Sequence, residues 1–189
     1  GAAVTTIDGW RQNDSVVKCI SGEGPSTVLD GFTITGGTGN EDLYSEKETV
    51  GGGLLCLHSS PTIKNCIFVS NESSYQGGAV FNGDRSNTVI RNCKIRSNIS
   101  ERGGGLYNSR GRPEIRDSVI SNNEAEYGGG GMYNFGSNIR VISCVLKENR
   151  ADYIGGGIYD YDSSGKLIET VFTNNVALFS GNAMYRGYR

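Results

Sequence analysis

A glycine-rich phrase of six residues recurs along this chain at a constant spacing of 26 residues. It begins at Gly51, Gly77, Gly103, Gly129, Gly155 and Gly181, and reads GGGLLC, GGAVFN, GGGLYN, GGGMYN, GGGIYD and GNAMYR. A phosphate-binding glycine loop occurs once, at a strand-to-helix junction, so six copies exclude that reading. Self-similarity at a fixed period of this length is typical of a solenoid, in which each repeat is one turn of the chain.

Other positions repeat at the same period. An apolar column is formed by Ile63, Val89, Ile115, Val141 and Leu167, and an asparagine column by Asn71, Asn98, Asn123, Asn149 and Asn175. A further column consists of Asn82, Asn108, Asn134 and Asp160. Stacked carboxamides hydrogen-bond to one another along a stack of strands, so we interpret both polar columns as structural. Only the second coil slips by one residue, between Asn82 and Asn98, which indicates a local bulge.

The apolar residues alternate over short runs, and no helical period of 3.6 residues is present. Gly, Asn and Ser clusters break these runs every few residues. Three short strands per 26 residues, with each turn in register above the last, predict an all-β fold: a parallel β-helix of about seven coils. The repeated glycines then lie at tight corners, where side chains are disfavoured.

The phrase GG[GA]-aliphatic-aromatic-Asn, followed by aliphatic-x-x-Asn, resembles the right-handed parallel β-helix repeats of the pectate-lyase-like superfamily. It is similar in particular to the GGA[I/L/V] and FxxN repeats of bacterial polymorphic outer-membrane proteins. The matching segments are GGAV from Gly77, FVSN from Phe68 and FTNN from Phe172. The resemblance covers residues 51–189 and implies a right-handed helix. It implies little about activity, because one solenoid hosts many functions.

The length of 189 residues suits a single domain, which we place at 1–189. Residues 1–50 are less regular coils with an acidic loop at 38–50, and residues 51–189 are regular coils. The loop holds Glu41, Asp42, Glu46 and Glu48. We interpret it as a solvated acidic loop; a calcium site is the alternative, but no regular ligand spacing supports it. Because neither end reads as a capping coil, we expect a fragment of a longer protein, or end-to-end contact with another molecule.

The fifth position of the phrase gives an aromatic column that follows an inward aliphatic residue, so alternation turns it outward. It comprises Phe81, Tyr107, Tyr133, Tyr159 and Tyr185. Small neighbours two residues earlier are expected to leave these rings laterally uncovered. A second column, Tyr75, Tyr127, Tyr153 and Phe179, precedes the glycine corner. The rings either stabilise the stack of strands or form a platform for sugar rings, and the fifth-position residues are our glycan-binding candidates.

Five cysteines are present without a CxxC pair, so no zinc site is predicted. Cys66 and Cys93 share a column in adjacent coils, and Cys144 lies in it two coils further on. Small buried thiols in the core are one interpretation. A Cys66–Cys93 disulfide in an oxidising compartment is the other.

Catalytic signatures of the enzymes with this fold are missing or broken. The segment RGRPEIR, Arg110 to Arg116, departs from the Arg-x-Pro-x-x-Arg pattern of pectate lyases at Gly111. His58, the only histidine, has no obvious carboxylate partner in the sequence. We therefore predict a non-catalytic, extracellular or cell-surface module with a structural and adhesive role toward a polysaccharide or surface protein. The alternative is a polysaccharide lyase or glycoside hydrolase whose active site lies partly outside this chain.

The charge pattern limits the other classes of partner. The 18 basic and 20 acidic residues are well mixed and give a net charge of −2, which argues against nucleic-acid binding. No apolar run is long enough to predict a membrane span. No motif predicts a cofactor or a metal. End-to-end or lateral self-association is compatible with an elongated solenoid.

Overall fold

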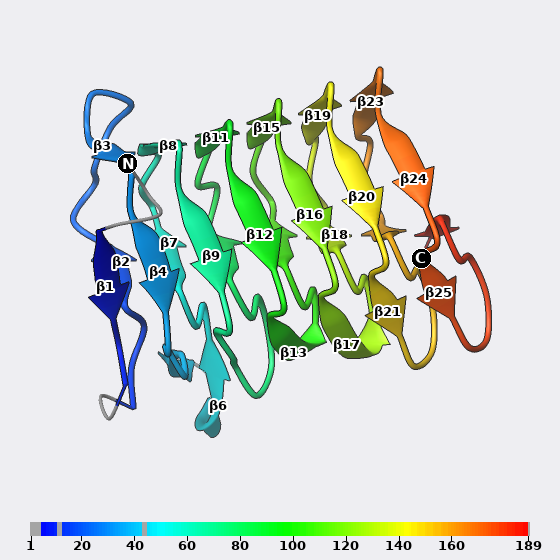
Figure 1. The fold of residues 1–189 in the computed structure, drawn as a ribbon, viewed down its shortest axis with the longest axis horizontal. Coiled ribbons are helices and arrows are strands. Elements are labelled where there is room, and N and C mark those ends of the chain that lie inside the picture. Colours follow the sequence, from blue (N-terminus) through cyan, green and yellow to red (C-terminus); the bar gives the residue numbers. More distant parts are fainter. Residues whose placement is uncertain (1–4, 11–12, 43–44, 189) are drawn as a thin grey trace.

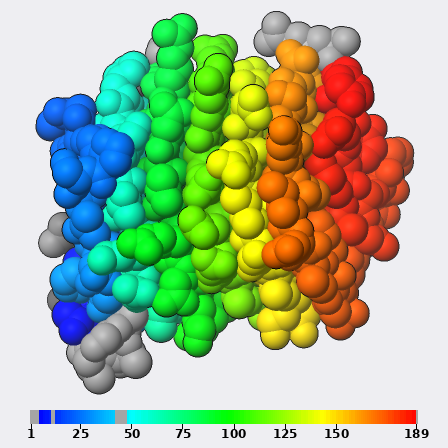
Figure 2. All heavy atoms as spheres, turned by 90° about the horizontal axis from the view of Figure 1, so that it is seen from above, coloured from blue at the N-terminus to red at the C-terminus, as the bar shows by residue number. Residues whose placement is uncertain are grey.

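The chain winds into successive coils that are stacked along one axis. The structure, a computed structural model, describes residues 5–10, 13–42 and 45–188, and these residues form strands and no helix. The coils follow one another from the N-terminal to the C-terminal end of the stack (Figure 1). Seen from above, they form adjacent bands in sequence order (Figure 2).

Three parallel sheets run along the stack, because each complete coil contributes one strand to each. The first sheet contains β1 (Thr6–Asp8), β4 (Thr33–Thr35), β9 (Ile67–Val69), β12 (Lys94–Arg96), β16 (Val119–Ser121), β20 (Val145–Lys147) and β24 (Val171–Thr173). The second, the aromatic sheet, contains β2 (Val17–Cys19), β7 (Leu54–Leu57), β10 (Val80–Gly83), β14 (Leu106–Ser109), β18 (Met132–Phe135), β22 (Ile158–Tyr161) and β26 (Met184–Gly187). The third contains β3 (Val28–Asp30), β8 (Thr62–Lys64), β11 (Val89–Arg91), β15 (Glu114–Arg116), β19 (Arg140–Ile142) and β23 (Lys166–Ile168). The seven strands of the first two sheets confirm the expected number of coils.

Two smaller sheets complete the described strands. One is parallel and contains β13 (Ile99–Arg102), β17 (Glu124–Gly128), β21 (Arg150–Ala151) and β25 (Val176–Ala177). The other is an antiparallel hairpin of β5 (Asn40–Asp42) and β6 (Ser45–Val50), and it lies where the sequence predicted an acidic loop. Val50 joins the hairpin to the next coil through a parallel bridge to Gln76. The insertion is therefore an ordered element beside the aromatic sheet.

The calcium alternative for this insertion falls partly outside the described part of the chain. Nothing is described of the side chains of residues 42–47, which include Asp42 and Glu46. Among the described residues, no three His, Cys, Asp or Glu side chains come together as metal ligands. No described helix is long and apolar enough to cross a bilayer.

Strand register confirms the 26-residue period. Val80 pairs with Leu106, and Met132 pairs with Ile158, each exactly one repeat further along the chain. The predicted apolar column was wrong at one position. In the third sheet Ile90, not Val89, pairs with Ile63 and Ile115. The cause is one extra residue in the turn after β10.

That extra residue is visible in the backbone angles. Asp84 and Arg85 both have positive φ, 47° and 64°, whereas the corresponding turn after β7 has the single residue His58 at 51°. The coil regains the period in β13, where the register shifts between Ser100 and Arg102. The predicted slip is therefore confirmed, and it consists of an insertion in the turn after β10 and a deletion within β13.

The inside of the stack is filled by aliphatic side chains and lined at one corner by the asparagine column. Ile63, Ile90, Ile115 and Phe68 are fully buried there. The asparagine Nδ2 atoms donate to the Oδ1 of the next coil at 2.9–3.1 Å, from Asn71 through Asn98, Asn123 and Asn149 to Asn175. Asn82, Asn108, Asn134 and Asp160 form a second such chain at 2.6–2.8 Å. Both polar columns are structural, as predicted.

Candidate functional site

The fifth-position rings project from the aromatic sheet away from the inner core, as alternation predicted, but most of them are covered. Phe81, Tyr107, Tyr133 and Tyr159 are only 4–8% exposed, and Tyr185 is 36% exposed. The expectation that these rings are laterally uncovered is therefore wrong for the first four. They form a second apolar cluster outside the inner core, together with Val50, Leu55 and Ile154.

Ring stacking explains part of this burial. The rings of Phe81 and Tyr107 are parallel to within 3° with centroids 5.5 Å apart, and Tyr107 and Tyr133 follow at 5.2 Å and 20°. Tyr159 meets Tyr133 edge-on, at 80° and 4.7 Å. Because neighbouring coils occupy the ring faces, a sugar cannot lie flat on them. These rings offer a ligand their edges, and the tyrosines among them also offer their hydroxyl groups.

A wall of aromatic rings flanks this column on the side of the glycine corner. Tyr127 stacks on Tyr153 with centroids 5.7 Å apart, and Tyr153 stacks on Phe179 at 4.7 Å. Tyr75 and Tyr127 pack against the outer cluster as half-buried residues. The second aromatic column predicted from the sequence therefore forms one side of the site.

A third aromatic column lies on the other side and was not recognised in the sequence. Phe135 and Tyr161 end their strands and stack with centroids 5.7 Å apart and planes within 8°. Their position in the repeat is occupied by Leu57, Gly83 and Ser109 in earlier coils. Because only two coils have an aromatic residue at this position, the repeat did not show it as an aromatic column.

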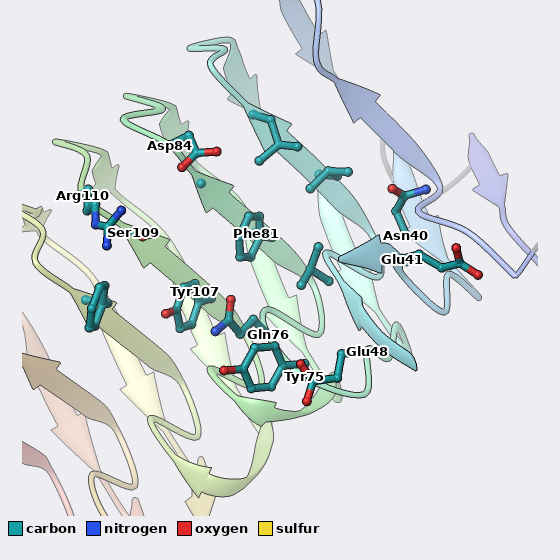
Figure 3. Close-up of a pocket in the computed structure, with 15 residues that line it drawn as sticks. Asn40, Glu41, Glu48, Tyr75, Gln76, Phe81, Asp84, Tyr107, Ser109 and Arg110 are labelled. Atoms are coloured by element: carbon teal, nitrogen blue, oxygen red, sulfur yellow. The ribbon is translucent and has the colours of Figure 1, made fainter. Parts of the chain in front are cut away.

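The small residues in that column open a hollow on the surface of the aromatic sheet. A Cβ atom on Gly83 would lie 2.3 Å from a ring carbon of Phe81, so the ring occupies the space that a side chain would need. Between Leu57 and Phe135 the surface is depressed, and the hollow has a volume of about 430 Å³. Phe81 and Tyr107 lie at its centre (Figure 3).

A second hollow of about 400 Å³ continues the first toward the C-terminal coils. Both are lined by Tyr75, Gln76, Tyr107 and Phe135, and the second also reaches Tyr133, Tyr159 and Tyr161. We call the two together the aromatic groove. It crosses the strands of the aromatic sheet from the β5–β6 hairpin to β22, and therefore follows the axis of the stack.

Polar groups line the two sides of the groove. Asn40, Glu41 and Glu48 come from the hairpin. Asp84, Ser109 and Arg110 come from the far ends of β10 and β14 and from the turns that follow them. In Figure 3 these two groups lie on opposite sides of the Phe81 and Tyr107 rings. A ligand in the groove would meet an apolar floor between amide, carboxylate and guanidinium groups.

Arg102 adds a cation to the second hollow. Its Nη1 donates to the Tyr75 hydroxyl at 2.8 Å, and its guanidinium carbon lies 4.9 and 5.3 Å from the ring centroids of Tyr75 and Tyr127. Its buried Nε lies 3.2 Å from a carboxylate oxygen of Glu101 but makes no hydrogen bond. The guanidinium is thus held by aromatic rings.

The hydroxyl groups of Tyr133 and Tyr159 in the groove are neutral at physiological pH. Burial raises the pKa of Tyr133 well above its usual value and raises the pKa of Tyr159 to about 12. A neutral phenol both donates and accepts hydrogen bonds. The floor can therefore hydrogen-bond to a polar ligand without carrying a charge.

His58 has a carboxylate neighbour that the sequence did not reveal. Its Nε2 lies 3.7 Å from Oδ2 of Asp84, beside a hollow of about 270 Å³ that Arg85 and Arg110 also line. Asp84 follows His58 by one full period of 26 residues. This spacing alone could have predicted that the two residues lie side by side in adjacent coils. The expectation that His58 lacks such a partner was wrong, although its side chain is 74% exposed.

The segment from Arg110 to Arg116 is divided between two surfaces. Arg110 lines the groove, whereas Arg116 lies in β15 of the third sheet. There Arg116 forms ion pairs with Glu114 and Asp117 at 3.8 and 3.2 Å. Its charge is therefore engaged on another face of the molecule.

The five cysteines are free thiols and are buried, which agrees with the interpretation of small core residues. Each thiol of the Cys66, Cys93 and Cys144 column donates to the carbonyl two residues earlier, at 3.1–3.3 Å. In the intervening coil, Ser118 makes the same bond at 2.7 Å. Each of these positions thus holds a small side chain that donates a hydrogen bond. The Cys66–Cys93 disulfide stays a prediction.

Residues 52–186 match the family model for the right-handed β-helix region. The chain belongs to the right-handed β-helix family. No curated protein and no solved structure matches it. The family match confirms the predicted architecture, whereas the similarity of this β-helix to polymorphic outer-membrane proteins rests on its repeat motifs alone.

Proposed function

We propose that this β-helix is a non-catalytic, extracellular or cell-surface module with a structural and adhesive role, and that it binds a glycan chain in the aromatic groove. The observation that carries the proposal is the continuity of the groove over several coils. Two hollows of about 430 and 400 Å³ share four lining residues and follow the stack axis. An extended polymer fits such a groove better than a compact ligand does.

The lining chemistry supports a glycan. Sugar rings combine apolar C–H faces with many hydroxyl groups, and binding sites for small molecules combine an apolar floor with a few placed polar groups. Here Phe81 and Tyr107 supply the floor, and Gln76, Asp84 and Arg110 supply donors and acceptors. Phe135 lines both hollows and is half-buried, so a ligand that spans the groove would contact it.

The resemblance of the repeats and the shape of the site support the adhesive role and the location outside the cell. The repeat motifs are similar to those of outer-membrane proteins, and the sequence lacks the catalytic signatures of the enzymes with this fold. A rigid solenoid presents an extended surface, which is how repeat proteins commonly bind their partners.

A pair of matched substitutions tests the proposal. Phe135→Ala removes a groove ring, whereas Phe179→Ala removes an exposed ring that lines neither hollow. Each ring stacks on one tyrosine, so each change removes one stacked pair. After a glycan array identifies a ligand, titration should show affinity about tenfold lower, or about 1.4 kcal/mol, for Phe135→Ala alone. Equal affinities of the two variants, or an array without any bound glycan, would contradict the proposal.

A polysaccharide lyase or glycoside hydrolase is the second candidate, because Asp84 lines the groove within 3.7 Å of His58. A carboxylate and an imidazole at the edge of a binding groove are groups that acid–base catalysis can use. Incubation of the same sample with uronate and neutral polysaccharides separates the two functions. Turnover that disappears in His58→Ala would replace the adhesive proposal; binding without turnover would support it.

A further inference from the structure

Two cysteine pairs lie in neighbouring coils near the N-terminal end of the stack. Cys19 in β2 and Cys56 in β7 are directly paired positions of adjacent parallel strands, and both side chains belong to the inner core. The register therefore places the two side chains next to each other in the core. The sequence did not reveal this pair, because the hairpin insertion lengthens the spacing from Cys19 to Cys56 beyond one period.

Cys66 and Cys93 repeat this arrangement in the next coils. Each comes one residue before a strand of the first sheet, and those strands pair Ile67 with Lys94. The backbone nitrogen of Lys94 donates to the Cys66 carbonyl at 2.9 Å, so Cys66 and Cys93 lie at the same position in adjacent coils. Both side chains are buried in the inner core.

The spacing of the strands puts both cysteine pairs within bridging distance but leaves the fifth cysteine, Cys144, too far from its column neighbour. Paired Cα atoms of neighbouring strands lie about 4.8 Å apart, which is inside the range of about 4.4–6.8 Å that disulfides span. Ser118 occupies the column between Cys93 and Cys144, so these two are separated by two spacings, roughly 9.6 Å. Cys144 therefore has no bridging partner in its column.

We propose that Cys19–Cys56 and Cys66–Cys93 are two disulfide sites that tie the N-terminal coils together in an oxidising environment, and that Cys144 stays reduced. The oxidant is a small-molecule disulfide such as oxidised glutathione. The thiolate of one cysteine attacks a sulfur of this disulfide, forms a mixed disulfide and releases one small thiol. The partner cysteine then attacks the mixed disulfide, forms the protein S–S bond and releases the second small thiol. Two protein thiols are oxidised, one small disulfide is reduced, and the two thiol protons pass to the released thiolates.

The environment of the pairs favours the first step. The contact with Cys56 lowers the pKa of Cys19, and the contact with Cys93 lowers the pKa of Cys66 to about 7. Since the thiolate is the attacking species, these two cysteines are the attacking groups. Cys144 lacks a thiol neighbour, and burial raises its pKa.

Thiol counting and bridge mapping test the proposal. The reduced, unfolded full chain is refolded with reduced and oxidised glutathione, and folded reduced chain is incubated with oxidised glutathione in parallel. Remaining thiols are alkylated under denaturing conditions, and bridged peptides are identified by mass spectrometry. We expect one alkylated cysteine, Cys144, with the two proposed bridges. Five alkylated cysteines in both arms, or a bridge to Cys144, would overturn the proposal.

Serine variants assign the individual bridges, because a serine hydroxyl keeps a hydrogen-bond donor at the substituted position. Cys19→Ser should leave two free thiols, on Cys56 and Cys144, and keep the Cys66–Cys93 bridge. Cys144→Ser is the matched control and should leave none, with both bridges intact. Reduction should lower the Tm of the wild type by roughly 5–15 °C. An unchanged Tm on reduction would show that the bridges do not tie the coils together.

Discussion

Asn123 shows how one side chain connects three coils. Its Nδ2 donates to the Ile95 carbonyl at 3.0 Å and to Asn149 Oδ1 at 2.9 Å. Its Oδ1 accepts from the backbone nitrogen and from Nδ2 of Asn98, at 3.1 and 2.9 Å. The residue is fully buried, so each group that loses its partner would have no water to replace it.

Asn123→Asp should therefore be strongly destabilising. A carboxylate cannot donate, so the Ile95 carbonyl and the Asn149 oxygen lose their donor and face a buried charge. We expect the free energy of unfolding to fall by about 2–4 kcal/mol, measured from urea titration. The same change at exposed Asn138 should cost less than about 0.5 kcal/mol. Similar urea midpoints for the two variants would contradict the structural role of the column.

Asp160 is the one carboxylate in the second polar column. Its side chain is 2% exposed; it accepts from Asn134 at 2.6 Å and pairs with Arg186 at 3.3 Å. Burial raises its pKa against the opposing effect of these partners. Because the pKa of Asp160 is raised in the folded state, its contribution to stability is fully present at low pH, where the carboxyl is protonated. This contribution is lost as the pH rises above the ordinary carboxyl range.

Asp160→Asn should stabilise the protein at pH 7, because an amide continues the column without a buried charge. We expect a gain of about 0.5–2 kcal/mol in the free energy of unfolding. Near pH 4 more of the Asp160 carboxyl is protonated, so the wild type no longer holds a buried charge. The stability difference between Asp160→Asn and the wild type should therefore be smaller when the urea titrations are repeated at that pH. A gain that grows on acidification would show that the pKa of Asp160 is lowered in the folded state.

At the scale of the element, alternation along a strand predicted which side of the aromatic sheet each ring occupies. It did not predict exposure, because Phe81 and Tyr107 are covered by neighbouring coils and by the flanking columns. His58 and Asp84 were missed for a related reason. Their contact joins two coils, and one coil alone contains no partner for either residue.

Close approach between coils makes some glycines indispensable. A Cβ on Gly104 would lie 2.2 Å from the Glu124 carbonyl oxygen, which is backbone of β17 and cannot move aside. Gly104→Ala should reduce the free energy of unfolding by about 2–4 kcal/mol. Gly24 is the control, because no atom lies within 4 Å of its added Cβ, and Gly24→Ala should be neutral or stabilise by up to about 1 kcal/mol. Chemical denaturation of both variants measures the difference, and equal stability would contradict the described coil spacing.

At the scale of the whole molecule, the repeat predicted the coil count, the parallel register and both polar columns. Those features follow from every coil obeying the same pattern. The aromatic groove could not be predicted in the same way, because it depends on departures from the pattern. Gly83 and Ser109 replace large side chains in one column, and the β5–β6 hairpin adds a side to the hollow they leave.

Together these departures create the groove that we propose as a glycan site along the stack. The most direct measurement is a crystal structure of the chain with the oligosaccharide that an array selects. We predict that the sugar lies in the aromatic groove, follows the stack axis, and contacts Phe135 and Gln76. A sugar bound at another surface, with the groove filled only by water, would contradict the proposed glycan site.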